Sequence, residues 1–350
     1  MATLPQLKNV EAYRPCEWDL KVDPAGRQYW VDSFCTHLHL LETAILEEYP
    51  DVRPEKLAAF RTDYVAAMRA LDAEPDRFER IDILYLDEVR NDLLQRNGFD
   101  DPYRGVKARE NELALELLPD LLHEIDATPT EELIEKLAFG LMAGNLFDLG
   151  ALAAIERYQA EASEFRQLRD AQPVRPWFID EIDAWRKRWS DGSAYEHVAF
   201  FVDNAGPDIC LGCFPFIRWM LQEGSRVTLV ANTGPALNDA TAPEVLALLD
   251  RIADADDFAS KALQAGRLTV IASGNSAPLI DLTQLTKQCA ETLADADLII
   301  LHGMGRAVES NYQAAFSCDC LRSAVLKVGA VAKRLGGRLF DCVFQLQRAS

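Results

Sequence analysis

The sequence predicts an α/β protein in which an all-helical region (residues 1–190) precedes a mostly parallel, Rossmann-like α/β/α sheet region (residues 191–350). Before about residue 190, apolar residues recur three and four positions apart, which is the spacing of amphipathic helices. After it, short apolar runs alternate with helical segments, the pattern of parallel strands covered by helices on both faces. The length of 350 residues also allows two domains.

Helical spacing is clearest in five segments of the first region. These are Phe34–Leu46, Lys56–Leu71, Phe78–Leu94, Val106–Leu118 and Glu131–Leu146. The last follows Thr128, Pro129 and Thr130, where a capping hydroxyl and a proline near the first turn favour a helix start. We therefore expect a helical first half that covers the sheet region as a lid.

The second region alternates expected strands with expected helices. The strands are His197–Val202, Val227–Ala231, Leu268–Ala272 and Leu298–Leu301, and Arg338–Phe344 closes the series. The helices between them are Asp208–Gln222, Pro243–Ile252, Leu282–Leu293 and Cys318–Leu335. The strands are nearly continuous apolar runs, as expected for strands that are buried on both faces.

Charge and composition exclude several classes of partner. The chain has 36 basic and 56 acidic residues, a net charge of −20, which disfavours binding to nucleic acid or to anionic membranes. No apolar run approaches the ~18 residues of a membrane span, and the first residues do not resemble a secretory signal. Eight scattered cysteines indicate reduced thiols, so we expect a cytoplasmic protein.

Polar residues follow the carboxyl ends of four expected strands, the edge at which open α/β sheets bind ligands. These clusters are Asp203–Asp208, Asn232 with Asn238 and Asp239, Ser273-Gly274-Asn275, and Gly303-Met304-Gly305-Arg306. One such cluster is common in loops. Four on the same edge indicate a binding site.

Three of these residues have the oxygen donors that suit Mg²⁺ or Mn²⁺: Asp203, Asn204 and Asp239. The alternative is structural, with Asp203 and Asn204 forming a turn and Asp239 capping the helix near Pro243. For Asp208, at the start of an expected helix, capping is favoured over catalysis.

The fourth cluster has features of an anion site. Gly303 and Gly305 can expose successive backbone N–H groups beside Arg306. From Arg306 to Ser350 there are seven basic and three acidic residues, a net +4, although this is equally typical of a solvated basic helix face. A metal, an N–H nest and an arginine in one cleft would bind phosphate.

Several motifs resemble those of the metal-dependent damage-control phosphatases, a family long described as a domain of unknown function. The resemblance is to the subgroup of plant stand-alone proteins and of domains fused to a pantothenate-kinase-like region. It covers nearly the whole chain. The motifs are Ala143–Gly150, Arg175–Asp180, Val202–Gly206, Asn238-Asp239, Gly303–Arg306 and Gly336–Asp341.

This resemblance implies a divalent metal ion (Mg, Mn, Co or Ni) bound by Asp203, Asn204 and Asp239. It also implies that the Gly303–Arg306 loop contacts the substrate phosphate, and that Asn145 and Asp148 face the same cleft. His302 stands where the subgroup signature normally has Glu.

The predicted function is hydrolysis of small phosphometabolites by a metal-dependent phosphatase, with a damage-control role. The resemblance suggests 4′-phosphopantetheine, its damaged forms, or sugar or nucleotide phosphates as substrates. Asp203 and Asp239 are the catalytic candidates, with either water or Asp203 as the nucleophile. The alternatives are an S-adenosylmethionine-dependent carboxyl methyltransferase and a non-catalytic metabolite-binding protein. The methyltransferase should have a glycine-rich turn after the first strand, whereas Asp203–Asp208 has one Gly and two carboxylates.

Overall fold

A computed structural model describes residues 1–148, 162–192 and 194–349. Its sheet has seven strands in the order β1-β7-β6-β5-β2-β3-β4. The strands are β1 (Ile179–Asp180), β2 (His197–Phe201), β3 (Arg226–Ala231), β4 (Leu268–Ala272), β5 (Leu298–His302), β6 (Asp319–Val325) and β7 (Cys342–Gln347). Strands β2 to β6 are parallel, and β7 pairs antiparallel with β6. The prediction of a mostly parallel α/β sheet with a helical N-terminal region is confirmed.

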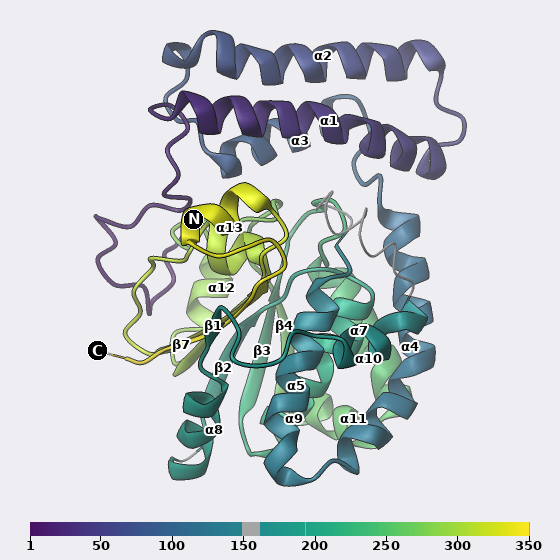
Figure 1. Cartoon of the computed structure of the whole chain (residues 1–350). Coiled ribbons are helices and arrows are strands. Elements are labelled where there is room, and N and C mark those ends of the chain that lie inside the picture. The colour runs from purple at the N-terminus through teal and green to yellow at the C-terminus, as the bar shows by residue number, and fades with distance from the viewer. Residues whose placement is uncertain (149–161, 193, 350) are drawn as a thin grey trace.

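Helices cover both faces and one edge of this sheet (Figure 1). The α-helices are α1 (Pro24–Glu48), α2 (Pro54–Ala73), α3 (Ile83–Arg96), α4 (Arg104–Asp126), α5 (Thr130–Asn145), α7 (Phe165–Asp170), α8 (Ile182–Asp191), α9 (Phe214–Gln222), α10 (Ala242–Ala255), α11 (Asp257–Gln264), α12 (Lys287–Thr292) and α13 (Gly329–Leu335). Two 3₁₀ turns are η1 (Pro75–Arg77) and η2 (Ala162–Glu164), and two π-helical turns are η3 (Asp208–Cys213) and η4 (Gly305–Glu309). Helices α1, α2 and α3 form a separate layer above the sheet in Figure 1.

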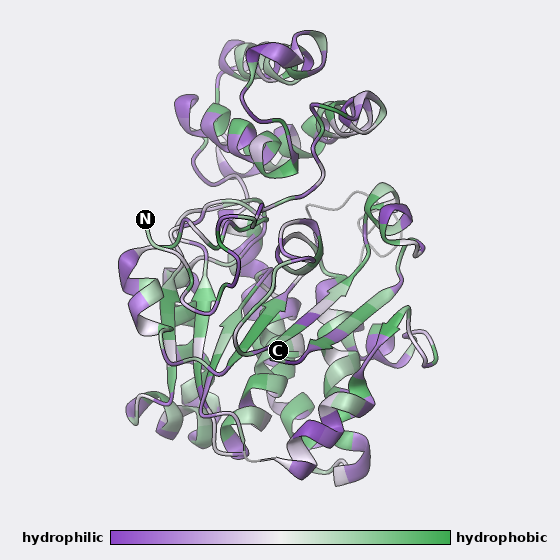
Figure 2. Cartoon of the chain, turned by 90° about the vertical axis from the view of Figure 1, so that its left-hand side faces the viewer, coloured by the Kyte–Doolittle hydropathy of each residue, from purple (hydrophilic) through white to green (hydrophobic). Residues whose placement is uncertain are grey.

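Two hydrophobic cores lie on the two faces of the sheet. Alternate residues of β2 enter different cores: Val198 and Phe200 pack with α4, α5 and α9, whereas Ala199 and Phe201 pack with the core that includes α1–α3. In Figure 2 the strands are largely apolar, and the outer helices carry the hydrophilic stretches. The first core spans residues on both sides of the expected division at 190, so the boundaries 1–190 and 191–350 stay a prediction.

The chain order creates a switch point between β2 and β5. After β2 the chain adds β3 and β4 on one side, and it then returns to add β5 and β6 on the other side. Ligands of open α/β sheets bind in the crevice that forms at such a point. The two π-helical turns, η3 and η4, follow these same two strands, and π-helical turns occur frequently at functional sites.

The expected helix Cys318–Leu335 is wrong, because its first half is strand β6 and only α13 is helical. All seven residues of β6 are buried, and a strand buried on both faces shows no alternation that would distinguish it from a buried helix. The expected helix Leu282–Leu293 is helical only over α12.

Two helix starts also differ from expectation. Helix α1 begins at Pro24, because the Asp23 side chain caps it by accepting from the Gly26 N–H. At α5 the N-cap is Pro129, and no side chain caps the helix. The Thr128 hydroxyl instead donates to the Glu124 carbonyl. No helix in the described part of the chain combines the length and the apolar character needed to cross a membrane.

Candidate metal centre

Asp203, Asn204 and Asp239 line one cavity at the carboxyl edge of the sheet. The backbone brings them together: Asn204 and Asp239 form an isolated antiparallel bridge, and the Ala240 N–H donates to the Asp203 carbonyl at 2.9 Å. The loop after β3 is thus paired with the loop after β2. The expected convergence of these three side chains is therefore present in the structure.

Arg306 links the two carboxylates of this group. Its Nη1 contacts Asp203 Oδ1, and its Nη2 lies 2.8 Å from Asp239 Oδ2 and 3.0 Å from Asn232 Oδ1. All of these side chains are buried. The guanidinium thus faces carboxylates, and its expected contact with a substrate phosphate stays a prediction.

Two side-chain amides fix the orientation of Asp203. Its Oδ2 accepts hydrogen bonds from Asn145 Nδ2 and from Asn204 Nδ2, each at 3.0 Å. The Asn204 nitrogen also lies 3.2 Å from Asp208 Oδ2, so a nitrogen and not an oxygen must face these carboxylates. The amide oxygen of Asn204 is therefore the atom directed away from them, where it can serve as a metal ligand.

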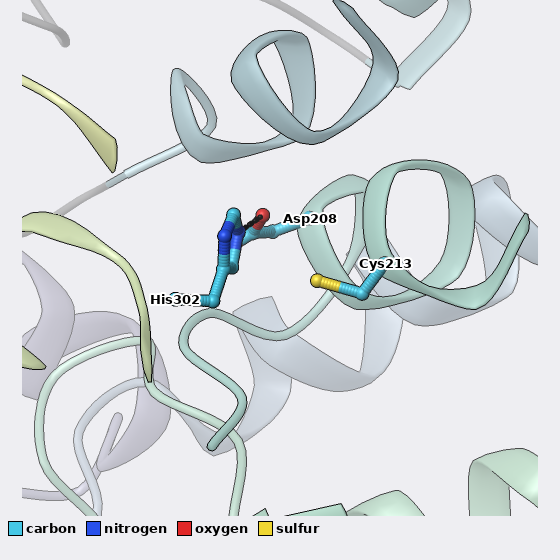
Figure 3. A group of neighbouring side chains, drawn as sticks. All are labelled: Asp208, Cys213 and His302. Carbon is cyan, nitrogen blue, oxygen red and sulfur yellow. Dashed lines mark hydrogen bonds and ion pairs between the residues drawn. The ribbon is translucent and has the colours of Figure 1, made fainter. Parts of the chain in front are cut away.

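Asp208 holds the Asn204 backbone through a hydrogen bond, and Asp208 is itself held by His302, a contact drawn in Figure 3. Asp208 Oδ2 accepts from the Asn204 backbone N–H at 3.0 Å, and Asp208 Oδ1 lies 2.9 Å from His302 Nε2. His302 Nδ1 is 2.8 Å from Ser323 Oγ. The helix-capping role favoured for Asp208 is wrong, because Pro207 is the N-cap residue and the carboxylate binds these partners instead.

Asp208 and His302 are also close to Cys213, so that one ligand atom from each lies within 4.8 Å of the others. Although burial alone would raise it, the pKa of Asp208 is lowered by His302. Burial raises the pKa of the Cys213 thiol well above its ordinary value, which keeps it protonated and a poor ligand. The Asp208–His302 pair therefore fits a hydrogen-bonded support better than a second metal site.

The donor set fits a divalent cation. Burial, with repulsion from Asp203, raises the pKa of Asp239 to about 7 even though Arg306 opposes the shift. Asp148, which lines the same cavity, is paired with Lys327. Asp203 and Asp239 thus carry more negative charge than Arg306 neutralises. Hard oxygen donors with a net negative charge suit Mg²⁺ or Mn²⁺.

The glycine-rich loop after β5 is shaped by its approach to Asp203. Gly303 has φ +92°, and a Cβ atom there would lie 2.2 Å from Asp203 Cγ. Its N–H donates to the Ser323 carbonyl, so it is not available to an anion. Met304 and Gly305 line the cavity.

The residues after β4 are not part of this cavity. Gly274 and Asn275 line a separate, polar cavity of ≈ 580 Å³ beside α3. The Asn275 amide donates to the carbonyls of Ala277 and Leu279, each at 2.7 Å, and its N–H donates to Ser273 Oγ. These bonds hold the loop, and a substrate contact by these three residues stays a prediction.

The cavity has lining residues that the sequence analysis did not identify. They come from α1 and α3 above the sheet and from η4: His37, Asp87, Arg90 and Glu309. In α3, Asp87 and Arg90 lie among the apolar residues of the buried helix face, and this was the one sequence signal that could have identified them.

Residues 40–343 match the family described as the damage-control phosphatase ARMT1-like domain. Over its whole length the chain is 33% identical to a protein named pantothenate kinase 2 from Arabidopsis thaliana. Over 99% of its length it is 31% identical to the 4′-phosphopantetheine phosphatase of Mus musculus. It spans only 42% and 48% of these two relatives.

A stand-alone relative is matched over most of both chains. It is a damage-control phosphatase of Arabidopsis thaliana, 35% identical over 85% of this chain and 80% of its own length. Among solved structures, a DUF89 family protein from Pyrococcus horikoshii superposes with a TM-score of 0.65 at 16% identity. That superposition covers 91% of this chain and 97% of the other, and it supports the fold alone.

Proposed function

Because this chain belongs to the damage-control phosphatase ARMT1-like family, we propose that it is a metal-dependent phosphomonoesterase that acts on small phosphorylated metabolites. The family is generally metal-dependent. The observation that carries the proposal is the convergence of Asp203, Asn204 and Asp239 on one cavity at the switch point of the sheet. The family does not favour the methyltransferase alternative.

Asp203, Asn204 and Asp239 would hold the divalent ion, with Mg, Mn, Co and Ni as the candidates. When bound, such an ion offsets the charge of the phosphoryl group and polarises it toward attack. Both carboxylate oxygens of Asp203 are engaged, one by Arg306 and one by the two amides. These three bonds leave one lone-pair site of the carboxylate for the metal ion, which favours water over Asp203 as the nucleophile.

The substrate class is suggested by a relative and by the size of the cavity. The mouse relative is named a 4′-phosphopantetheine phosphatase, and we propose this ester or its damaged forms as the substrate here. The cavity has a volume of ≈ 90 Å³, well below the ~300–1,000 Å³ of pockets that enclose whole ligands. The cavity is therefore large enough for a phosphoryl group only. We propose that the α1–α3 layer is a lid that moves to admit the rest of the substrate.

The direct test measures phosphate release from 4′-phosphopantetheine and a panel of sugar and nucleotide phosphates, with Mg²⁺, Mn²⁺, Co²⁺ and Ni²⁺ compared. We expect metal-stimulated release that Asp203→Ala and excess chelator abolish. Asp295→Ala is the control, because Asp295 is exposed and pairs with His197 at the start of β2. Full activity of Asp203→Ala, or full activity in chelator, would overturn the mechanism. Binding of phosphate esters without release would favour a metabolite-binding protein instead.

We also propose a reducing compartment, the cytoplasm, as the place of action. All eight cysteines are free, and burial raises the pKa of thiols such as Cys210 and Cys289, which keeps them protonated and unreactive. Cell fractionation with a tagged full-length chain tests this, and recovery in an oxidising compartment would contradict it.

A further inference from the structure

Two side chains of the lid each have a buried nitrogen atom without a hydrogen-bond partner among the described residues. Arg90 on α3 is 7% exposed, and its Nε makes no hydrogen bond there, whereas its Nη2 pairs with Asp87. His37 on α1 has a buried Nε2 with no such partner. Both side chains line the cavity that contains Asp203, Asn204 and Asp239.

Leaving such groups unsatisfied is costly. A buried donor without an acceptor destabilises the folded state, and the loss is greater when the group is charged. Most buried polar groups in native proteins are therefore paired, and exceptions often have a functional role. Two unpaired donor nitrogens in one cavity, from two different helices, indicate an acceptor other than the residues that the structure describes.

The two groups lie close enough to influence one another. Burial, and then the charge of Arg90, lowers the pKa of His37 to about 4, so His37 is neutral near pH 7 and can donate one N–H. Arg90 keeps its charge and is anchored by an ion pair to Asp87, with Nη2 2.7 Å from Oδ1. The Arg90 guanidinium also lies over the Phe34 ring, 5.3 Å from its centroid, which restricts its orientation.

We propose that Arg90 and His37 form the lid half of an anion site, in which they donate to the phosphoryl oxygens of the substrate above Asp203, Asn204 and Asp239. This rests on the proposed phosphatase function and assigns new binding residues to the same site. An arginine fork matches the geometry of phosphate oxygens. Docking of the phosphoryl group would bring the α1–α3 layer and the sheet edge together around one charged group.

The carboxylates that face this site do not oppose an anion there. Asp87 is held in its ion pair with Arg90. Burial, with repulsion from Asp87, raises the pKa of Glu309 to about 8, which favours its uncharged form near pH 7. Asp148 is paired with Lys327. Arg90 is paired with one carboxylate, and its Nε donor is left for an anion in the cavity.

Calorimetric titration of inorganic phosphate into the Mn²⁺-loaded full chain tests this site without turnover. We expect Arg90→Gln to raise the phosphate Kd about tenfold or more and Arg90→Lys to restore part of the affinity, because the first variant loses a charged hydrogen bond and the second keeps the charge. His37→Asn should raise the Kd about threefold, since it removes one neutral hydrogen bond. The Mn²⁺ Kd should change less than about twofold in each variant, because neither side chain is a metal ligand.

Arg27→Gln is the matched control. Arg27 lies on α1 and is equally buried at 7%, but it bonds to Asp72 and to the Leu20 carbonyl. Wild-type phosphate affinity in Arg90→Gln, or equal weakening in Arg27→Gln, would overturn the proposal. Should Arg90→Gln fail to fold, as judged by circular dichroism, unchanged phosphate affinity in His37→Asn overturns it. Phosphate binding that depends on Arg90, without hydrolysis of any ester, would reject the phosphatase function and leave this site standing.

Discussion

His302 Nε2 lies 2.9 Å from Asp208 Oδ1, and both side chains are fully buried. The other oxygen of Asp208 accepts a hydrogen bond from the Asn204 backbone N–H. The Asp208–His302 pair therefore fixes the position of Asn204, one of the expected metal ligands. Groups that orient metal ligands in this way commonly set metal affinity. The residue in the position of the subgroup's usual Glu therefore supports Asn204 through Asp208 and is not among the residues that line the cavity.

The identity of residue 302 should control stability. His302→Glu places a second carboxylate against Asp208 in a site without solvent, and we expect it to lower the free energy of unfolding by ~3 kcal/mol or more. His302→Gln keeps a donor and should cost only about 1 kcal/mol. Urea denaturation of the two variants compares them, and equal costs would contradict the assigned contact.

Asp208 should affect metal binding without touching the metal. Asp208→Asn preserves size but replaces one acceptor with a donor beside Asn204, and we expect it to raise the Mn²⁺ Kd about 10- to 100-fold. Cys213→Ala is the control, because Cys213 is close to Asp208, whereas the Asn204 amide bonds to Asp203 and Asp208. Electron paramagnetic resonance of free Mn²⁺ gives both affinities. Equal weakening by Cys213→Ala would place the ion at Asp208, Cys213 and His302 instead.

Residue 303 must be glycine for two reasons, its positive φ and its close approach to Asp203. A comparison with Gly224 distinguishes the two. Gly224 also has a positive φ, +108°, but nothing lies within 4 Å of the place of its Cβ. Gly224→Ala should therefore cost about 1–2 kcal/mol from backbone strain alone. Gly303→Ala should cost at least ~2 kcal/mol more, because its Cβ meets Asp203. Urea denaturation measures both, and similar costs would contradict the close approach.

The free energy of unfolding should decrease as the pH is lowered, in part because of His37. Its pKa is lowered to about 4 in the folded chain by burial and by Arg90, with His39 contributing and Asp148 opposing. Between pH 6.5 and about 4 the unfolded chain therefore binds more protons at this site, and the free energy of unfolding decreases as the pH falls. His37→Gln should flatten this decline by up to ~1.4 kcal/mol per pH unit. Parallel curves for wild type and variant, from urea denaturation at several pH values, would contradict the shift.

The sheet and its binding edge could be predicted because the signals there are local. The apolar runs of β2 and β5 end at polar residues, and parallel strands bring those ends to one edge. Asp203 and Asp239 could thus be placed near each other from the sequence alone. Strand β6 could not be identified, because burial on both faces removes the alternation of apolar and polar residues.

The rest of the site depends on contacts between residues distant in the sequence. Asp208 is oriented by His302, 94 positions later, so neighbouring residues alone made it resemble a helix cap. Arg90 and His37 reach the cavity only because α1 and α3 pack above the sheet edge, and the hydrophobic pattern of one helix does not reveal its neighbour. Only the packing of the lid on the sheet shows that Arg90 and His37 line the cavity.

The central claim is that Asp203, Asn204 and Asp239 bind one divalent cation. Anomalous diffraction from a crystal grown with Mn²⁺ tests it most directly, because it locates the ion without any assay. We expect a single strong peak in the cavity, within ~2.0–2.6 Å of oxygens from all three side chains. A peak at Asp208, Cys213 and His302, or no peak between Asp203 and Asp239, would contradict the account.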